Sequence, residues 1–391
     1  MVDGNTTLTG AYCTDPVGML ADIIAHSKYL CVGGDCGGRI TKLGLTHTDI
    51  KGKTGWLPFV LYDGPELYES FAALNGPVLK FKGATAKKGL KSIFAVFKWL
   101  ISKHNACLNG DMKFQCMVLG HDTASARYPC PICLTRQHQY STNFQLRTST
   151  TKGTMDASHS ISQTPLIRVR ATHIVPPVLH IYLGMGEIVT KDILPKLATQ
   201  EIADNVITCL KIKSIKDREG GGGKADVYKL NGPELRKYGK SEFPFIVAHA
   251  MNEMGYDTKT VKEVEDKLHT LKSWIMKLDR LLLTTGELSD GHITELQQLA
   301  DDIHKQLPED MGRNITPKMH MLYHCVQFAK NHRALGNCAE SQMESMHASM
   351  NRDLVRLRNL IRHPAEQLRC VLADTVERHI KNYPLPVNEQ E

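Results

Sequence analysis

The sequence predicts an α/β fold that is followed by a mostly helical stretch. Two apolar runs within 28–46 and a third at 57–62 have the composition of strands. Residues 89–103 instead carry apolar side chains at helical spacing. Alternation of strands and helices is typical of an α/β domain. Beyond about residue 220 the pattern becomes almost wholly helical.

The first part of the chain carries the strand signals. Residues 28–46, KYLCVGGDCGGRITKLGLT, are interpreted as a strand, a glycine-rich turn and a second strand, with Asp35 at the turn. A further strand is expected at Lys113–Leu119, immediately after Asp111. The helix expected at 89–103 carries lysines on its outer side.

The later part carries the helical signals. One apolar stripe runs through 268–282 and another through 291–306. Pro317 is placed at a helix start, where its missing N–H group costs nothing. A last helix is expected from about Ala339 to about Arg358.

Bulk composition bounds the class of protein. The chain has 391 residues, of which 42% are apolar, so it can bury a sizeable core. Its most apolar helix candidate, 90–101, is interrupted by Lys98 and is shorter than the ~18–20 residues of a membrane span. The first residues, MVDGNTTLTG, lack the pattern of a secretory signal. We expect an intracellular protein that does not bind membranes.

Positive charge is concentrated in two regions, although the formal net charge is only +7. Residues 80–103 hold seven lysines and no acid, and residues 311–363 hold eight Lys and Arg against three acids. Such patches suit a polyanion because each neutralised phosphate releases counterions. Two solvated helix faces are the alternative interpretation. The candidates for nucleic-acid binding are Lys87, Lys88, Lys91, Arg352, Arg356 and Arg358.

The pair Cys130-Pro-Ile-Cys133 is half of a tetrahedral zinc site, because two thiolates at this spacing can bind one ion. A redox pair is the alternative. His320 and His324, four residues apart on one helical face, are candidates for the second half. The competing ligands that lie nearer in the sequence are His121, His138 and His159.

Four acids are candidates for a catalytic metal site. Phosphodiester hydrolysis and strand transfer use two divalent ions, and Mg²⁺ prefers carboxylate oxygens. Asp35 and Asp111 are placed beside strands of the predicted sheet, as this chemistry requires. Glu340 and Glu344 lie at i,i+4 on the last helix and can face the same way.

Several spacings together resemble one family. The run GDMKFQCMVLGHDTASARYPCPIC (110–133) is similar to a segment of the vertebrate V(D)J recombinase catalytic subunit and of the related Transib-type transposases. In that family a metal-binding aspartate precedes the first zinc cysteine by nineteen residues, as Asp111 precedes Cys130. The segment PPVLHIYLG (176–184) also resembles a family motif.

The resemblance continues through HMLYHCVQFAKNHRALGNCAESQMESMHASMNR (320–352). Here Gly336 lies twelve residues after the second histidine, and Glu344 falls eight further on, where the family has its catalytic glutamate. The similarity spans about 35–355. It departs from the family in one spacing, since the recombinase places its two histidines five residues apart.

The resemblance implies a ribonuclease-H-like core that is interrupted by a mostly helical zinc-binding insertion. It implies structural Zn²⁺ at Cys130, Cys133, His320 and His324, and two catalytic Mg²⁺ or Mn²⁺ ions at Asp35, Asp111 and Glu344. Glu340 remains an alternative to Glu344, and Asp49 or Asp63 an alternative to Asp35. A residue near the two histidines remains an alternative zinc ligand.

This interpretation divides the chain into five parts. They are an N-terminal extension (1–27), the first part of the core (28–135), a linker with the helical insertion (136–335), a C-terminal helix that completes the core (336–375) and a flexible tail (376–391). Residues 139–165, rich in Ser and Thr, are expected to be a linker or flexible loop, and Gly220–Gly223 a second break.

The function that follows is a DNA transposase or recombinase that cleaves and joins strands with metal ions. The first alternative is a catalytically inactive, transposase-derived, zinc-stabilised DNA-binding protein, and the second is a zinc-containing helical interaction module. The resemblance also leads us to expect a nuclear location, a homodimer and an accessory subunit. About thirty residues precede the first predicted strand. We therefore expect the family's N-terminal DNA-recognition region to be missing, as in a gene fragment, a decayed copy or a domesticated core.

Overall fold

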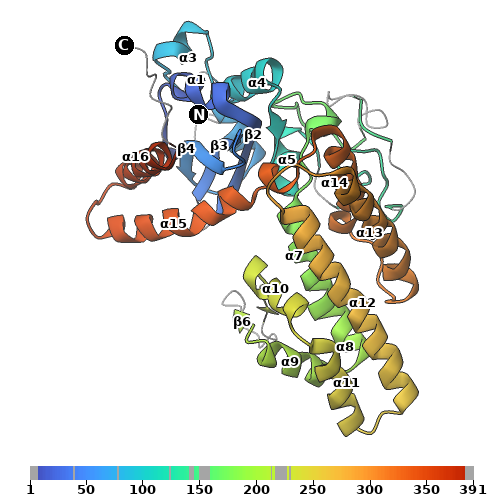
Figure 1. Ribbon diagram of the computed structural model, residues 1–391. Helices are drawn as coiled ribbons and strands as arrows, with labels where there is room; N and C mark the ends of the chain where they lie inside the picture. Colours follow the sequence, from blue (N-terminus) through green and yellow to red (C-terminus); the bar gives the residue numbers. More distant parts are fainter. Residues whose placement is uncertain are drawn as a thin grey trace. The chain divides into compact units, whose positions relative to one another are not determined.

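The computed structural model contains two units, which are coloured along the sequence in Figure 1. The first comprises Met1–Pro177, Thr285–Glu287 and Gln327–Glu391, and the second comprises Val178–Thr284 and Leu288–Val326. The described residues are 8–37, 40–76, 79–122, 125–140, 145–148, 159–212, 214–215, 227–228 and 230–383. Most of the predicted 139–165 linker and all of Gly220–Gly223 lie outside them.

The first unit is built on a five-stranded sheet with the order β1-β4-β3-β2-β5. Its strands are β1 (Thr9–Tyr12), β2 (Ser27–Gly37), β3 (Ile40–Asp49), β4 (Thr54–Asp63) and β5 (Cys107–Leu108). The first four in this order pair antiparallel, whereas β5 runs parallel to β2. Beyond β5, Leu108 makes a further parallel bridge with Ile174. The predicted mixture of strands and helices is confirmed.

The strand pair predicted at 28–46 is confirmed, with one adjustment. Asp35 lies within β2 and faces Lys42 of β3 in the ladder, so it is part of a strand and not of the turn. Pairing with β3 fixes the position of the β2 backbone from which the Asp35 carboxylate projects.

The strand predicted at 113–119 is wrong, because Met112–Val118 forms helix α5. Phe114, Cys116 and Val118 are all buried, which imitates the alternation of a strand. The Asp111 carboxylate caps the helix by accepting a hydrogen bond from the Phe114 N–H at 2.7 Å. Gln115 is also buried, and its amide donates to the carbonyls of Gly110 and Val175. These contacts stabilise a helix at a sequence with strand periodicity.

Helices lie on both sides of the sheet (Figure 1). The N-terminal helices are α1 (Pro16–His26), α2 (Tyr68–Leu74), α3 (Gly83–Lys87) and α4 (Ile93–His104), and the short turn η1 spans Ala171–His173. A chain of ring contacts at centroid distances of 5.6–6.3 Å links β4, α4, α2 and α5 through Phe59, Phe97, Phe94, Phe71 and Phe114. Such edge-to-face contacts add to the free energy of apolar burial.

The C-terminal segment contributes the turn η3 (Gly336–Cys338) and two helices, α15 (Ser341–Arg358) and α16 (Pro364–Asn382). Met343, Met350 and Leu354 of α15 pack in one apolar cluster with α16 and with Trp56 and Leu61 of β4. The single closing helix that we expected is therefore a pair. The tail predicted from residue 376 is wrong as far as Asn382, which ends α16.

The segment predicted as an N-terminal extension also belongs to the core. β1 pairs with β4, and Val17 and Leu20 of α1 are buried. The extension therefore covers sheet surface that would otherwise be exposed.

The second unit is almost entirely helical, as predicted. Its elements are α7 (Val178–Glu187), the π-helical turn η2 (Ile188–Ile193), α8 (Leu194–Leu197), α9 (Gln200–Cys209), β6 (Ser214–Ile215), β7 (Val227–Tyr228), α10 (Gly232–Lys240), α11 (Phe243–Glu253), α12 (Thr258–Leu283) and α13 (Asp290–Glu309). Helix α14 (Pro317–His332) begins in this unit at the predicted proline. Within the described residues, no helix combines the length and the apolar character that crossing a bilayer would require.

Replacement of Gly110 with alanine should destabilise the protein by about 2 kcal/mol or more, since a strained backbone costs about 1–3 kcal/mol. Gly110 has φ +121, and a Cβ there would lie 2.6 Å from the Phe114 ring and 2.9 Å from the Gly34 carbonyl oxygen. Gly89→Ala is the control, because Gly89 has φ +67 but no atom within 4 Å of a Cβ. Urea unfolding measures both, and equal losses of stability would contradict the proposed steric conflict.

Candidate functional site

Two acidic side chains are brought together by close packing at the end of β2. Gly33 and Gly34 precede Asp35, and a Cβ at Gly33 would lie 1.9 Å from the Asn109 side-chain oxygen. A Cβ at Gly34 would lie 2.6 Å from the Phe114 ring. Only glycine allows the segment after β5 to approach β2 this closely. Asp111, which follows that segment, therefore lies beside Asp35.

A hydrogen-bonded anchor brings the start of α15 to the same place. The buried Asn109 amide donates to Thr46 Oγ1 at 3.1 Å and to the Cys338 carbonyl oxygen at 3.2 Å. Thr48 Oγ1 also donates to the Asn337 carbonyl oxygen at 3.2 Å. These bonds hold η3 against the sheet, so that the first turns of α15 extend past Asp35.

The resulting cluster has two groups of potential metal ligands that share Asp35. One contains Asp35, Glu66 and Asp111, and the other contains Asp35, Glu344 and His347. Within each group, one potential ligand atom of each residue lies within 4.8 Å of the others. The structure thus brings together the three acids that the sequence predicted, Asp35, Asp111 and Glu344, although they are distant in the sequence.

Glu66 was not anticipated from the sequence. It follows β4 after a Gly-Pro turn, and its position at a strand end is the signal that could have identified it. Burial, reinforced by the Asp111 and Asp35 charges, raises the pKa of Glu66 to about 8. Its Oε2 lies 3.6 Å from Lys113 Nζ, whereas its buried Oε1 has no hydrogen-bond partner among the described residues. A divalent ion would satisfy that oxygen, so the site fits a cation.

Lys42 is the second group that sequence reasoning missed. It is fully buried, and its Nζ donates to the Ile40 carbonyl oxygen at 3.0 Å. Burial lowers the pKa of Lys42 to about 8, although the charges of Asp35 and Glu344 act in the opposite direction. Pairing of the two predicted strands across the glycine-rich turn places Lys42 opposite Asp35, and this was the available signal.

His347 is the third such group, one helical turn after Glu344 on α15. Burial and then the Lys42 charge lower the pKa of His347 to about 3, so its imidazole is neutral at physiological pH. Its Nε2 lies 3.1 Å from Asp35 Oδ2. Its i,i+3 spacing from the predicted glutamate was the available signal.

The alternative acids do not join these groups. Glu340 precedes α15 and is buried at 1% exposure, but it belongs to neither ligand group. Asp49 and Asp63, the alternatives to Asp35, are also outside both groups. Asp49 ends β3 at the opposite end of the β2–β3 ladder from Asp35, and Asp63 ends β4, two strands away from β2. Among the described residues, the geometry therefore favours Glu344 over Glu340, and Asp35 over the other aspartates.

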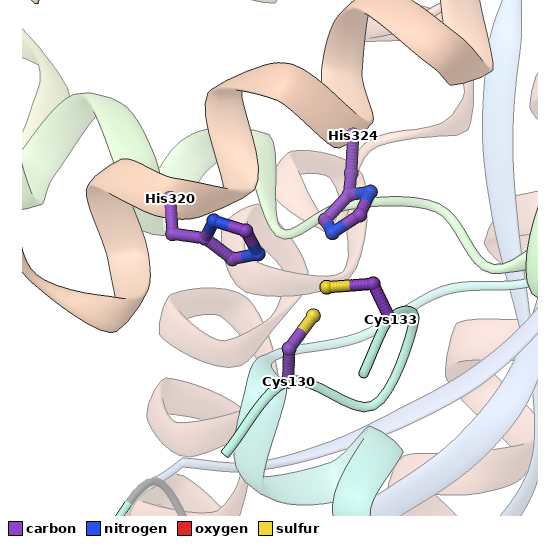
Figure 2. Close-up of side chains that lie close together, drawn as sticks. All are labelled: Cys130, Cys133, His320 and His324. Atoms are coloured by element: carbon purple, nitrogen blue, oxygen red, sulfur yellow. The ribbon is translucent and has the colours of Figure 1, made fainter. Parts of the chain in front are cut away.

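Figure 2 shows the second cluster, in which two cysteines from a loop and two histidines from α14 point toward one another. Cys130, Cys133, His320 and His324 are each at most 3% exposed, and their potential ligand atoms lie within 4.8 Å of one another. This is the donor set of a tetrahedral zinc site with four protein ligands. The cysteine loop, predicted from spacing alone, and the two predicted histidines therefore come together.

The loop around the cysteines is held by hydrogen bonds. The backbone of Cys133 forms an isolated antiparallel β-bridge with Leu146. The buried Arg147 donates from Nε to the Cys130 carbonyl oxygen at 2.9 Å. Arg147 Nη2 also lies 2.8 Å from His121 Nε2. His121 therefore supports the loop and is not in the ligand group. The other competing histidines, His138 and His159, are outside it as well.

The thiols favour a bound cation. A contact with Cys130, together with burial, raises the pKa of the Cys133 thiol well above its ordinary value. Two adjacent buried thiolates without a cation would repel each other at high cost. A Zn²⁺ ion removes this penalty because it binds the deprotonated form.

The predicted nucleic-acid ligands are all exposed and form two separate patches. Lys87, Lys88 and Lys91 lie at the end of α3 and before α4, whereas Arg352, Arg356 and Arg358 lie on the last turns of α15. In Figure 1, α3 and α15 are at opposite ends of the first unit. The lysine patch and the arginine patch therefore do not form one continuous surface.

Comparison with protein-family models and with curated proteins finds no match to this chain.

Purified protein should contain about one zinc ion per chain, and Cys130→Ser should lose it together with thermal stability. The expected decrease in stability is several kcal/mol, because the binding energy of a structural zinc ion, about 10–16 kcal/mol in zinc-finger peptides, is in large part folding energy. Metal analysis and thermal unfolding are the measurements. Cys209→Ser is the matched control, since Cys209 is exposed. Wild-type protein that folds fully without zinc would refute the assignment.

Proposed function

We propose that this protein cleaves and joins DNA strands by metal-dependent phosphodiester chemistry, as a transposase- or recombinase-like enzyme. The observation that carries the proposal is the convergence of Asp35, Glu66, Asp111 and Glu344 from four separate segments of the chain. Surface acids have no physical reason to gather in this way, since like charges repel.

The shared carboxylate of Asp35 supports a site for two ions. Divalent ions held in such a site supply an activated nucleophile and stabilise the leaving oxygen of a phosphodiester. Asp35 would face both ions, with Glu66 and Asp111 on one side and Glu344 on the other. The cap bond to Phe114 fixes the orientation of the Asp111 carboxylate, so that it does not have to reorganise during the reaction.

The strand arrangement supports a ribonuclease-H-like core. Three antiparallel strands, β2, β3 and β4, are followed by β5, which runs parallel to β2, and by the parallel bridge from Leu108 to Ile174. We further propose that the second unit is the helical insertion of such a core. In this proposal Zn²⁺ at the Cys2His2 cluster is structural, because four protein ligands leave no open position for a substrate.

The substrate we propose is DNA, which the exposed arginines of α15 would contact through its phosphates. These arginines are on the same helix as Glu344, so a backbone that follows the helix would reach the carboxylates. Contacts of this kind position the duplex but carry little sequence information.

Asp35→Asn and Asp111→Asn should each slow cleavage of duplex DNA by about 100-fold or more, which corresponds to about 2.7 kcal/mol of transition-state stabilisation. Thermal stability should stay constant or rise, since each change removes like-charge repulsion. A plasmid-nicking assay with Mg²⁺ or Mn²⁺ measures the rate, and Asp22→Asn on the exposed face of α1 is the control. A wild-type protein that binds DNA without cleaving it would instead support the inactive DNA-binding alternative.

Replacement of Arg352, Arg356 and Arg358 with alanine should weaken DNA binding and flatten its salt dependence. The slope of log K against log salt should fall by up to about 2.7, or about 0.9 for each phosphate that an arginine no longer neutralises. The control removes the same charge at Lys259, Lys262 and Lys305, of which the first two lie within 4.0 Å of acidic side chains. Binding measured by fluorescence anisotropy should give an unchanged slope for the control. An equal slope in both triple variants would show that α15 does not bind the DNA backbone.

A further inference from the structure

We infer that His347 is a direct metal ligand, and that the Asp35–Glu344–His347 group selects a divalent first-row transition ion such as Mn²⁺ over Mg²⁺. The inference deepens the proposed function, on which it rests for the presence of divalent ions at Asp35. It assigns a preference for a transition ion to the Asp35–Glu344–His347 group and a preference for Mg²⁺ to the Asp35–Glu66–Asp111 group.

The placement of the His347 ring is the first argument. The residue is 8% exposed, and its Nε2 is buried without a hydrogen-bond partner among the described residues. Nε2 nevertheless lies 3.1 Å from Asp35 Oδ2, so the two atoms are close but not aligned for a hydrogen bond. Two ligand atoms at about 2.0–2.1 Å from one ion and at right angles are about 2.8–3.0 Å apart. The separation is compatible with two ligands of one ion, and the missing alignment disfavours a donor and its acceptor.

The donor set is the second argument. Asp35, Glu66 and Asp111 offer oxygen only, which suits Mg²⁺. The group with Glu344 and His347 offers two oxygens and one imidazole nitrogen. Imidazole suits transition ions, and Mg²⁺ exchanges its water for nitrogen reluctantly. The two groups therefore differ in the ion that they favour.

The surrounding charge is the third argument. Lys42 is fully buried and interacts with the charges of both Asp35 and Glu344. Its ammonium group repels a divalent cation and so offsets part of the attraction that the two carboxylates exert on that cation. A hard ion such as Mg²⁺ depends chiefly on that attraction, whereas a transition ion also gains from its bond to the neutral nitrogen. Lys42 repels either divalent ion equally, so the bond to the His347 nitrogen, which favours a transition ion, supplies a larger share of the total binding on this side.

The test is Mn²⁺ binding to the full, zinc-loaded chain, followed by electron paramagnetic resonance. We expect the bound Mn²⁺ to show magnetic coupling to a nitrogen nucleus, and Mg²⁺ to displace it from this site only at much higher concentration. His347→Glu replaces the nitrogen by an oxygen of similar reach. It should abolish the nitrogen coupling and reduce the Mn²⁺/Mg²⁺ affinity ratio by about tenfold or more, since even outer-shell changes cost about 10–100-fold in metal affinity.

Two further variants make the outcome decisive. His249→Gln, at a side chain that is 77% exposed on α11, should keep the nitrogen coupling unchanged. His347→Gln should abolish the coupling without the added charge of glutamate, and it replaces His347→Glu if that variant does not fold. Nitrogen coupling that survives both His347 changes, or Mn²⁺ that binds with no such coupling in the wild type, would overturn the inference.

The readout also separates this inference from the proposed function. DNA cleavage with equal Mn²⁺ and Mg²⁺ affinity and no nitrogen coupling would refute the role of His347 and leave the proposed function intact. Nitrogen coupling that disappears with His347, in a protein that does not cleave DNA, would support the metal ligand and refute the nuclease activity.

Discussion

The repulsion among carboxylates around Asp35 is the constraint on which the rest of the first unit depends. Asp35 and Glu66 are almost fully buried, and Asp111 and Glu344 are half-buried beside them. In a low-dielectric pocket such a set is stable only if positive charge or protonation compensates it. Buried Lys42 supplies one part of this compensation, while burial together with the Asp111 and Asp35 charges raises the pKa of Glu66 to about 8. Divalent ions would complete it, so the pocket has the electrostatics of a cation site rather than of a structural ion-pair network.

The surrounding structure holds these groups against their repulsion. Packing of Phe114 against Gly34, together with the cap bond from the Phe114 N–H to the Asp111 carboxylate, holds the start of α5 beside β2. On the opposite side, Asn109 fixes the segment before α15, and Met343 anchors that helix in the apolar cluster. The free energy that opposes the repulsion therefore comes from apolar burial and from buried hydrogen bonds, which are insensitive to metal. We expect the pocket to be largely preformed, as a site that must not reorganise during catalysis requires.

The sequence predicted the parts of the candidate sites that depend on spacing. The cysteine pair and the i,i+4 histidines have fixed local geometry, so they were identifiable, and the resemblance in spacing led to Asp111 and Glu344. Lys42 and Glu66 were missed because their roles arise from strand pairing and from burial, which no local pattern encodes. The strand predicted at 113–119 failed for a related reason. The cap by Asp111 and the hydrogen bonds from Gln115 to the carbonyls of Gly110 and Val175 stabilise a helix there, and Val175 is distant in the sequence.

The two candidate centres differ in a way that bears on what each can do. The Cys2His2 cluster is closed, because its four buried protein ligands would complete the tetrahedral coordination of a zinc ion and leave no position for water or substrate. The cluster around Asp35 is open, since Asp111 and Glu344 keep part of their surface exposed and three protein ligands on each side leave positions for water or phosphate. A closed site contributes to folding, whereas an open one can bind and exchange ligands. The chemistry that we propose therefore belongs to the open cluster around Asp35, whereas a metal ion in the closed Cys2His2 cluster would contribute to the stability of the fold.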